Sequence, residues 1–298
     1  MIVALAALAL VVTGAEPVTA GSTRVIVLPG ATSAEGIAAG EGATFYAGDL
    51  FGGDIFRGDV KRGTAKRYID VPAGRMAVGM AFHDDRDLLF VAGGFTGQGY
   101  VYNTRNRETV ATYQFARPNV GLINDVTVTK QGAWFTDSFR AQLYLVPFHK
   151  GQPATSFGIL RLSGPAADTS GQFNLNGIRA VRDGKTLILA HSAKGLLHTV
   201  DAATGASATI AGVSVPTADG LEYRDGRLWV VQNTNRVTRV RLSEDLRSGT
   251  VDKVITNAKF QVPATAALFG GRLAVVNAKF DTGIPPTADR YEVVIVKR

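Results

Sequence analysis

The sequence predicts an all-β fold, a six-bladed β-propeller with four strands in each blade. A short strand pattern begins again six times, at Glu35, Gly79, Asn124, Asn176, Asp219 and Thr265. Most of these restarts lie roughly 40–50 residues apart, which is the spacing typical of propeller blades. Helical periodicity is absent from the sequence beyond an apolar run at the amino terminus. Together these observations favour a single domain built from repeated small sheets.

The unit that begins at Asn176 shows the expected order of strands within one blade. An Asp183-Gly184 pair favours a tight turn between the first two strands, and Gly205 marks the turn before the fourth. The predicted strands are 178–181, 186–190, 196–200 and 206–210. The interval between Asn124 and Asn176 is longer than the others, and we assign roughly seven extra residues within 152–173 to a loop over one face.

Closure of the ring requires the two ends of the chain to meet in one sheet. Segments 23–28 and 291–296 both have the pattern of a strand, and we predict that they pair in the sixth blade. Because a closed ring leaves few free strand edges, we expect a monomer.

The amino terminus carries an apolar run over residues 2–12, followed by small residues. This pattern predicts a secretory signal peptide over residues 1–20 and a mature propeller over 21–298. No Lys or Arg precedes the run, so a short membrane anchor is the alternative. The run is shorter than the roughly 20 residues that a membrane span needs. We therefore expect a secreted or cell-envelope protein without stable membrane insertion after cleavage.

Composition excludes several classes of function. The chain contains no Cys, which rules out disulfides, thiolate catalysis and sites ligated by Cys. Its formal net charge is +7, but the basic residues are scattered and are not interleaved with aromatic residues. Nucleic acid is therefore not an expected partner.

Four of the six restarts carry an oxygen-bearing side chain directly after an apolar residue. These four are Glu35, Asn124, Asn176 and Asp219. Asn and Asp also begin ordinary turns, but four matching positions in a ring predict a metal on its axis. Two carboxylates and two amide oxygens are hard ligands that suit Ca²⁺. Mg²⁺, Mn²⁺ and Zn²⁺ remain alternatives, although Zn²⁺ more often takes His or Cys.

The ends of the second strands are expected on the same face as these ligands, because a hairpin returns the chain to its starting edge. The polar or small residues at these ends are Asp49, Gly93, Asp137, His191, Gln232 with Asn233, and Asn277. We predict that they form a rim around the metal that touches a substrate.

The order Glu, Asn, Asn, Asp in units one, three, four and five resembles a known family. That family includes senescence marker protein, gluconolactonase, the bacterial drug-responsive lactonase and squid diisopropyl fluorophosphatase. The similarity extends over nearly all of the mature chain, from Ala34-Glu35-Gly36 to Val275-Val276-Asn277. In that family the four side chains hold a divalent cation at the mouth of a six-bladed propeller. The resemblance implies the same role for Glu35, Asn124, Asn176 and Asp219.

A cation with open positions would polarise a lactone carbonyl or a phosphoryl oxygen and stabilise the oxyanion. Asp219 is expected to act as general base or as nucleophile. We predict His191 as a proton shuttle or substrate donor, with a hydrogen-bonded histidine of the rim as the alternative. Asp137 and Asn233 are predicted to orient the substrate.

The expected function is a calcium-dependent hydrolase of lactones or related esters, with a phosphotriester as a promiscuous substrate. A non-catalytic, calcium-stabilised propeller that binds a ligand at the cell surface is the alternative from another class. A metal-free propeller enzyme of the strictosidine synthase kind is a third hypothesis, and the complete quartet of oxygen ligands disfavours it.

Overall fold

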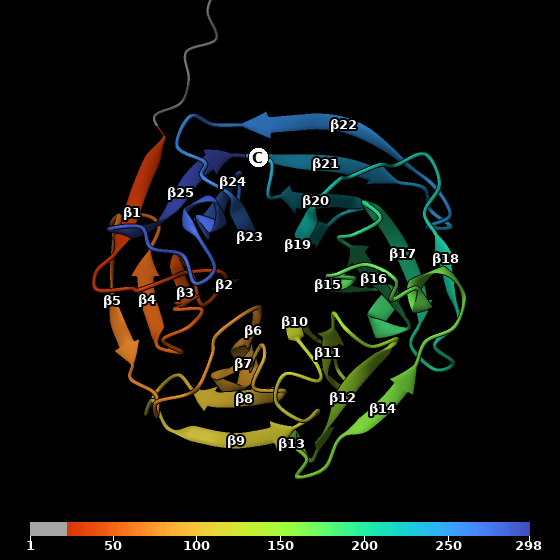
Figure 1. The fold of residues 1–298 in the computed structure, drawn as a ribbon, viewed down its shortest axis with the longest axis horizontal. Coiled ribbons are helices and arrows are strands. Elements are labelled where there is room, and N and C mark those ends of the chain that lie inside the picture. The colour runs from red at the N-terminus through yellow and green to blue at the C-terminus, as the bar shows by residue number, and fades with distance from the viewer. Residues whose placement is uncertain (1–22) are drawn as a thin grey trace, which may run out of the picture.

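The computed structural model describes residues 23–298 and shows six antiparallel sheets arranged in a ring (Figure 1). In five sheets the strand that comes first in the chain lies nearest the axis, whereas in the sixth the amino-terminal strand, 24–28, lies at the periphery. The prediction of an all-β, six-bladed propeller is therefore confirmed. The predicted signal peptide, residues 1–20, lies outside the described residues. None of the helices within residues 23–298 has the length and apolar character needed to cross a membrane.

The first three blades follow one another along the chain. Blade 1 contains β2 (Ile37–Ala39), β3 (Thr44–Gly48), β4 (Ile55–Asp59) and β5 (Thr64–Ile69). Blade 2 contains β6 (Met80–His83), β7 (Leu88–Ala92), β8 (Gln98–Asn103) and β9 (Thr109–Gln114). Blade 3 contains β10 (Ile123–Val128), β11 (Gly132–Asp137), β12 (Gln142–His149), β13 (Gln152–Pro153) and β14 (Gly158–Arg161).

The last three blades complete the ring. Blade 4 contains β15 (Leu175–Val181), β16 (Thr186–His191), β17 (Leu196–Asp201) and β18 (Ser207–Thr209). Blade 5 contains β19 (Ala218–Arg224), β20 (Arg227–Gln232), β21 (Arg236–Leu242) and β22 (Gly249–Thr256). Blade 6 contains β23 (Pro263–Phe269), β24 (Arg272–Asn277), β25 (Tyr291–Lys297) and β1 (Arg24–Leu28).

Blade 3 differs from the four-stranded plan. Its third strand, β12, is long enough to pair with β14 along one part and with the short β13 along another. The region 152–173, where the sequence suggested a loop, therefore supplies β13, β14 and a short 3-10 helix, η2 (Gly164–Ala167). The last two residues of this region, Gln172 and Phe173, line the cavity that the predicted ligands also line.

The ring closes as the sequence predicts. β1 pairs antiparallel with β25, from Arg24 opposite Ile295 to Leu28 opposite Tyr291. The amino-terminal strand is thus the outermost strand of a sheet whose other three strands come from the carboxyl terminus (Figure 1). Blade 6, made from both ends of the chain, thus closes the ring between blade 5 and blade 1.

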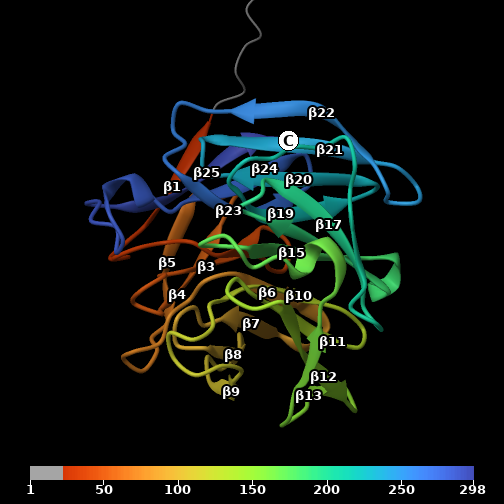
Figure 2. The same ribbon diagram turned by 45° about the vertical axis from the view of Figure 1, so that its right-hand side comes forward.

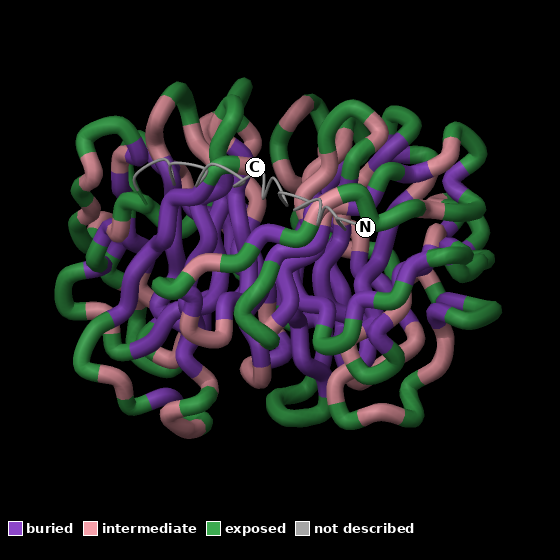
Figure 3. The backbone as a smooth tube through the Cα atoms, turned by 90° about the horizontal axis from the view of Figure 1, so that it is seen from above, coloured by how far each residue is buried: buried purple, intermediate pink, exposed green. Residues whose placement is uncertain are grey.

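The core lies in the middle layer of the ring, between neighbouring blades. Seen from above, buried backbone forms this layer and exposed loops cover both faces (Figure 3). The turned view shows the outer strands β9 and β22 on opposite sides of the ring (Figure 2). Large side chains such as Tyr100, Phe135 and Trp229 fill the spaces between sheets. This packing fixes the inner strands and therefore the residues that face the axis.

Candidate metal centre

The four predicted ligands lie together at the mouth of the ring. Glu35, Asn124, Asn176 and Asp219 all line one cavity of about 420 Å³. Asn124, Asn176 and Asp219 are the second residues of the innermost strands of their blades, Glu35 lies two residues before β2, and all four are buried. Residues separated by nearly two hundred positions in the sequence thus face one space.

A local irregularity of the inner strands exposes three of these side chains to the axis. In blades 3, 4 and 5, two residues of the first strand stand opposite one residue of the second. The two are Asn124 with Asp125, Asn176 with Gly177, and Asp219 with Gly220. Such a β-bulge takes a residue out of the ladder and changes the direction of its side chain. The repeated bulge therefore explains why three ligands occupy the same step of successive blades.

Glycine follows three of the four ligands for a steric reason. A Cβ on Gly36 would come within 1.9 Å of the carbonyl oxygen of Val78, and one on Gly177 within 2.4 Å of the carbonyl oxygen of Asp219. Neighbouring inner strands approach so closely at the axis that no side chain fits.

One oxygen of each ligand has no hydrogen-bond partner among the described residues. These buried atoms are Glu35 Oε2, Asn124 Oδ1, Asn176 Oδ1 and Asp219 Oδ1. Buried polar atoms are almost always paired, and four unpaired oxygens on one cavity form a donor set that could hold a cation. Two carboxylates and two amides fit the oxygen chemistry of Ca²⁺, with water completing roughly six to eight positions.

The other polar atom of three ligands is fixed by the residue that directly follows the second strand. Asn124 donates its Nδ2 to Ser138 Oγ at 2.9 Å, and Asn176 donates its Nδ2 to Ser192 Oγ at 3.1 Å. In blade 5, Asn233 donates its Nδ2 to Asp219 Oδ2 at 2.7 Å. These contacts determine which oxygen of each ligand faces the cavity.

The same three supporting residues also join their blade to the next one. Ser138 donates its hydroxyl to the carbonyl of Leu175, and Ser192 donates to that of Ala218. Asn233 donates to the carbonyl of Pro263 at 3.0 Å. Each supporting side chain therefore ties a ligand to the backbone of the adjacent inner strand.

The structure places Asp137 away from the cavity, which corrects the predicted rim position. Asp137 is fully buried, and its carboxylate accepts hydrogen bonds from the backbone N–H groups of Leu122 and Phe139 and from the Tyr144 hydroxyl. Side chains alternate along a strand, so Asp137 and the next residue, Ser138, point in opposite directions. The sequence argument located the correct end of β11 but chose the residue whose side chain points away from the cavity.

His191 requires the same correction. It is fully buried, and its Nε2 lies 2.9 Å from the carbonyl oxygen of Asp168. Its ring packs edge-on against His198, with ring centroids 5.7 Å apart, and it does not line the cavity. Ser192, one residue later, takes the position next to the ligand. Asn233 does line the cavity, where it contacts Asp219.

The remaining strand-end residues hold the chain that enters each blade. Gln232 donates its side-chain N–H to the Pro216 carbonyl, and Asn277 accepts a hydrogen bond from the Gln261 N–H. Asp49 accepts from the N–H of Thr32 at 2.8 Å. These buried polar groups position the ligands indirectly, by fixing the segment in front of each inner strand.

The two carboxyl groups of the candidate centre, those of Glu35 and Asp219, have raised pKa values. Burial, with the nearby charges of Asp219 and Asp125, raises the pKa of Glu35 well above its usual value. Burial raises the pKa of Asp219 to about 7, although the hydrogen bond from Asn233 opposes the change. A bound cation would remove the cost of placing both charges in one apolar ring.

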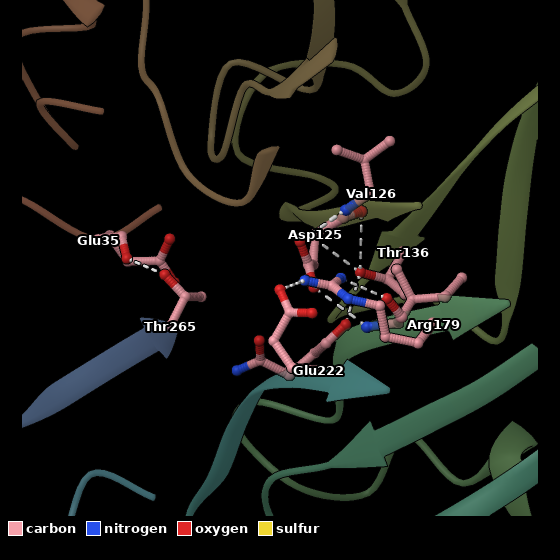
Figure 4. Close-up of polar contacts among 9 residues, drawn as sticks. Glu35, Asp125, Val126, Thr136, Arg179, Glu222 and Thr265 are labelled. Atoms are coloured by element: carbon pink, nitrogen blue, oxygen red, sulfur yellow. Dashed lines mark hydrogen bonds and ion pairs between the residues drawn. The ribbon is translucent and has the colours of Figure 1, made fainter. Parts of the chain in front are cut away.

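A largely buried ionic triad joins three successive blades beside the candidate metal centre. Arg179 of β15 lies between Asp125 of β10 and Glu222 of β19, at 3.5 and 3.0 Å (Figure 4). The same view shows Glu35 on the far side of the axis, where its backbone carbonyl accepts a hydrogen bond from Thr265. Sequence reasoning missed this triad. The available signal was a charged residue in each of three inner strands, in addition to the ligand that each strand carries.

The walls of the cavity are apolar. Leu50, Met76, Val78 and Leu122 line its sides. Four partly exposed phenylalanines from separate loops line it as well: Phe51, Phe95, Phe173 and Phe280. The cavity therefore combines an oxygen-rich site with hydrophobic surroundings.

Comparison with known proteins identifies the fold and not a family. Neither a protein-family model nor a curated protein matches the chain. Among solved structures, a protein from Lactobacillus plantarum is 17% identical over 82% of this chain and 77% of its own, with a TM-score of 0.60. The Malassezia sympodialis allergen Mala s 1 is 14% identical over 85% of this chain and 89% of its own, with a TM-score of 0.62.

A third similar structure is the hydrazine synthase of Kuenenia stuttgartiensis, which is 12% identical over 91% of this chain and 97% of its own, with a TM-score of 0.61. Sequence identities this low indicate a common fold alone. The chain belongs with the β-propellers.

Proposed function

We propose that this protein is a calcium-dependent hydrolase of lactones or related esters, akin to the gluconolactonase and senescence marker protein family. The observation that carries the proposal is the set of four buried, unpaired oxygens that face one cavity. Two carboxylates among them would balance the charge of a divalent cation. A hydrophobic cavity with a single polar region is the usual form of a small-molecule site.

Glu35, Asn124, Asn176 and Asp219 would hold the cation. When bound, Ca²⁺ would supply Lewis-acid polarisation of the substrate carbonyl and stabilise the charge that develops on its oxygen. The four phenylalanines that line the cavity, here called the aromatic mouth, would bind the rest of the substrate and exclude bulk water. They are Phe51, Phe95, Phe173 and Phe280. Ser138, Ser192 and Asn233 would keep the ligand oxygens in place throughout the reaction.

Asp219 is the residue of the centre best suited to handle a proton. Its Oδ2 is held by Asn233 while its Oδ1 faces the cavity. In hydrolysis the oxygen of water bonds to the carbonyl carbon and the ring C–O bond breaks. One proton of that water ends on the released hydroxyl oxygen. Asp219 would carry this proton as a general base, or would attack the carbonyl carbon first as a nucleophile.

The test uses the mature protein, residues 21–298, with calcium added and then chelated. Hydrolysis of a lactone panel is expected to require calcium and to fall by at least a hundredfold in Asp219→Asn. Asp245→Asn, at an exposed loop of blade 5, is the matched control and should retain full activity.

Two other outcomes decide against the proposal. Calcium binding by calorimetry without turnover of any lactone, ester or phosphotriester would favour the non-catalytic, ligand-binding propeller. Absence of calcium binding, with stability indifferent to chelation, would overturn the metal centre itself. Isotope labelling then separates base from nucleophile, because a nucleophilic Asp219 would acquire ¹⁸O from labelled water in a single turnover.

The proposal includes export of the protein. Export would depend on a signal peptide in residues 1–20. Amino-terminal sequencing of protein recovered from the culture medium or cell envelope would test cleavage after Ala15 or Ala20.

A further inference from the structure

We propose that the cavity binds a neutral ester or lactone with a long apolar chain, in preference to a polyhydroxylated sugar lactone. This inference rests on the proposed function and specifies its substrate class. It depends on three properties of the cavity: the aromatic mouth, the balance of charge and the shortage of free hydrogen-bonding groups.

The aromatic mouth is assembled from four different parts of the ring. Phe51 follows β3, Phe95 follows β7 and Phe173 precedes β15. Phe280 belongs to the short 3-10 helix η4 (Phe280–Thr282), which follows β24. All four are only partly buried, although large aromatic residues favour the core. Aromatic side chains gathered around a cavity favour an apolar occupant.

Contacts within the loops keep part of this mouth in place. Phe139 lies between Phe95 and Phe173, with ring centroids 6.1 and 6.2 Å from theirs. Phe51, Phe95 and Phe280 also pack against a buried core cluster that includes Leu50 and Met76. The apolar surface is therefore formed in advance, and a chain that enters the cavity would remain in contact with it from mouth to floor.

The charges of the cavity favour a neutral occupant. Within residues 23–298, the only charged side chains that line it are Glu35 and Asp219. Their two negative charges match one divalent cation, so the loaded centre has no net charge. No Lys, Arg or His of the described chain lines the cavity to receive a carboxylate or phosphate. An anionic substrate would lose its hydration without finding a counter-ion.

Few polar groups remain free to receive sugar hydroxyls. Ser192 donates to the Ala218 carbonyl, and Asn233 is engaged with Asp219 and Pro263. Thr217 donates its hydroxyl to the Pro216 carbonyl at 2.7 Å. Gln172 is the other polar residue of the lining outside the quartet, and it lies exposed at the mouth. The hydroxyl groups of a polyol would therefore lose their hydrogen bonds to water and contact phenylalanine side chains instead, which is unfavourable.

The test compares lactones that share one ring and differ only in their substituent. With calcium-loaded protein, kcat/KM should rise by about threefold to fourfold for each methylene from δ-valerolactone to δ-octalactone, and level off when the cavity is filled. Glucono-δ-lactone should be at least tenfold poorer than δ-octalactone. Equal rates along the alkyl series, or glucono-δ-lactone as the best substrate, would overturn the inference.

Two variants test whether the aromatic mouth carries the preference. Phe173→Ser and Phe280→Ser should each lose at least tenfold in kcat/KM for δ-dodecalactone, with a smaller loss as the chain shortens. Both residues are partly exposed, so the variants are expected to fold. Val251→Ser, on the exposed face of β22, is the matched control and should keep the full dependence on chain length.

A binding experiment separates this inference from the proposed function. An uncleavable ketone series, cyclohexanone to 2-octylcyclohexanone, is titrated into calcium-loaded protein by calorimetry. Affinity that rises with chain length supports the inference even if no lactone is hydrolysed. Hydrolysis of glucono-δ-lactone, together with no binding of the alkyl ketones, would overturn the inference and leave the hydrolase intact.

Discussion

Asn124 and Ser138 form a hydrogen bond that sets the orientation of a candidate metal ligand. Asn124 donates its Nδ2 to Ser138 Oγ at 2.9 Å, and Ser138 in turn donates to the Leu175 carbonyl of the next blade. Because the amide nitrogen is engaged, the amide oxygen of Asn124 faces the cavity. The side chain of Ser138 thus both orders the ligand and joins two blades.

Removal of this support should weaken metal binding. In Ser138→Ala the amide of Asn124 is free to rotate, and we expect calcium affinity to fall by about 10-fold to 100-fold. Calorimetric titration measures this change. Ser248→Ala removes an exposed hydroxyl on the connection before β22 and should leave the affinity unaltered. Equal affinities of wild type and Ser138→Ala would show that the amide does not need this partner.

Asp219→Asn should stabilise the metal-free protein at alkaline pH. With a pKa of about 7, Asp219 stays protonated in the folded protein at pH values well above 3.8, which is its pKa in the unfolded state. Its stabilising contribution is therefore complete below roughly pH 4 and is lost as the pH rises through about 7. At pH 8 the variant, which has no charge to bury, should be more stable by an amount on the order of 2 kcal/mol.

Urea unfolding at pH 5 and pH 8 in the presence of a chelator tests this expectation. The advantage of Asp219→Asn should grow between the two pH values. Calcium should then raise the stability of the wild type and leave the variant nearly unchanged. A variant less stable than wild type at pH 8 without calcium would contradict a buried, unbalanced charge at this position.

Acidification should destabilise the protein through His198. Burial, helped by His191, lowers the pKa of His198 to about 4 in the folded state. A lowered histidine pKa gives stability that is present above the unfolded-state value of roughly 6.5 and is lost as the pH falls toward 4. His198→Gln should therefore reduce the loss of stability between pH 7 and pH 5 by about 1–2 kcal/mol.

For each protein, the free energy of unfolding at pH 5 is subtracted from that at pH 7. The differences for wild type and His198→Gln are then compared. Carboxyl groups such as Asp219 titrate in both proteins, so their contribution cancels in the difference. His149→Gln, at an exposed position, is the control and should behave as wild type. An unchanged pH dependence in His198→Gln would mean that His198 is not held neutral.

Arg179→Met should be strongly destabilising. The variant leaves Asp125 buried and Glu222 largely so without their cation, and breaking a buried ion pair from one side costs about 3–5 kcal/mol. Arg247→Met, which breaks an exposed pair at 4.0 Å with Asp245, should cost less than about 1 kcal/mol. Chemical denaturation at pH 7 measures both. Similar losses in the two variants would show that the triad does not hold the blades together.

The sequence by itself determined the number of blades, the pairing of β1 with β25 and the positions of the four candidate ligands. Each of these depends on a repeated local pattern. Strand alternation and turn residues act over a few positions, so a repeat can be recognised without knowledge of distant contacts. The repeated position that Glu35 and Asp219 share could therefore be recognised from the sequence alone.

Only the tertiary structure decided which residues surround the ligands. A shift of one residue turns a strand-end side chain to the other face, so Ser138 and Ser192 occupy the places that sequence reasoning gave to Asp137 and His191. The ion pairs of Arg179 with Asp125 and Glu222 join segments from different blades. The loops that carry Phe51 and Phe173 likewise come from different blades and line one cavity. Such contacts depend on how the ring closes, because no local pattern records which loops converge over the axis.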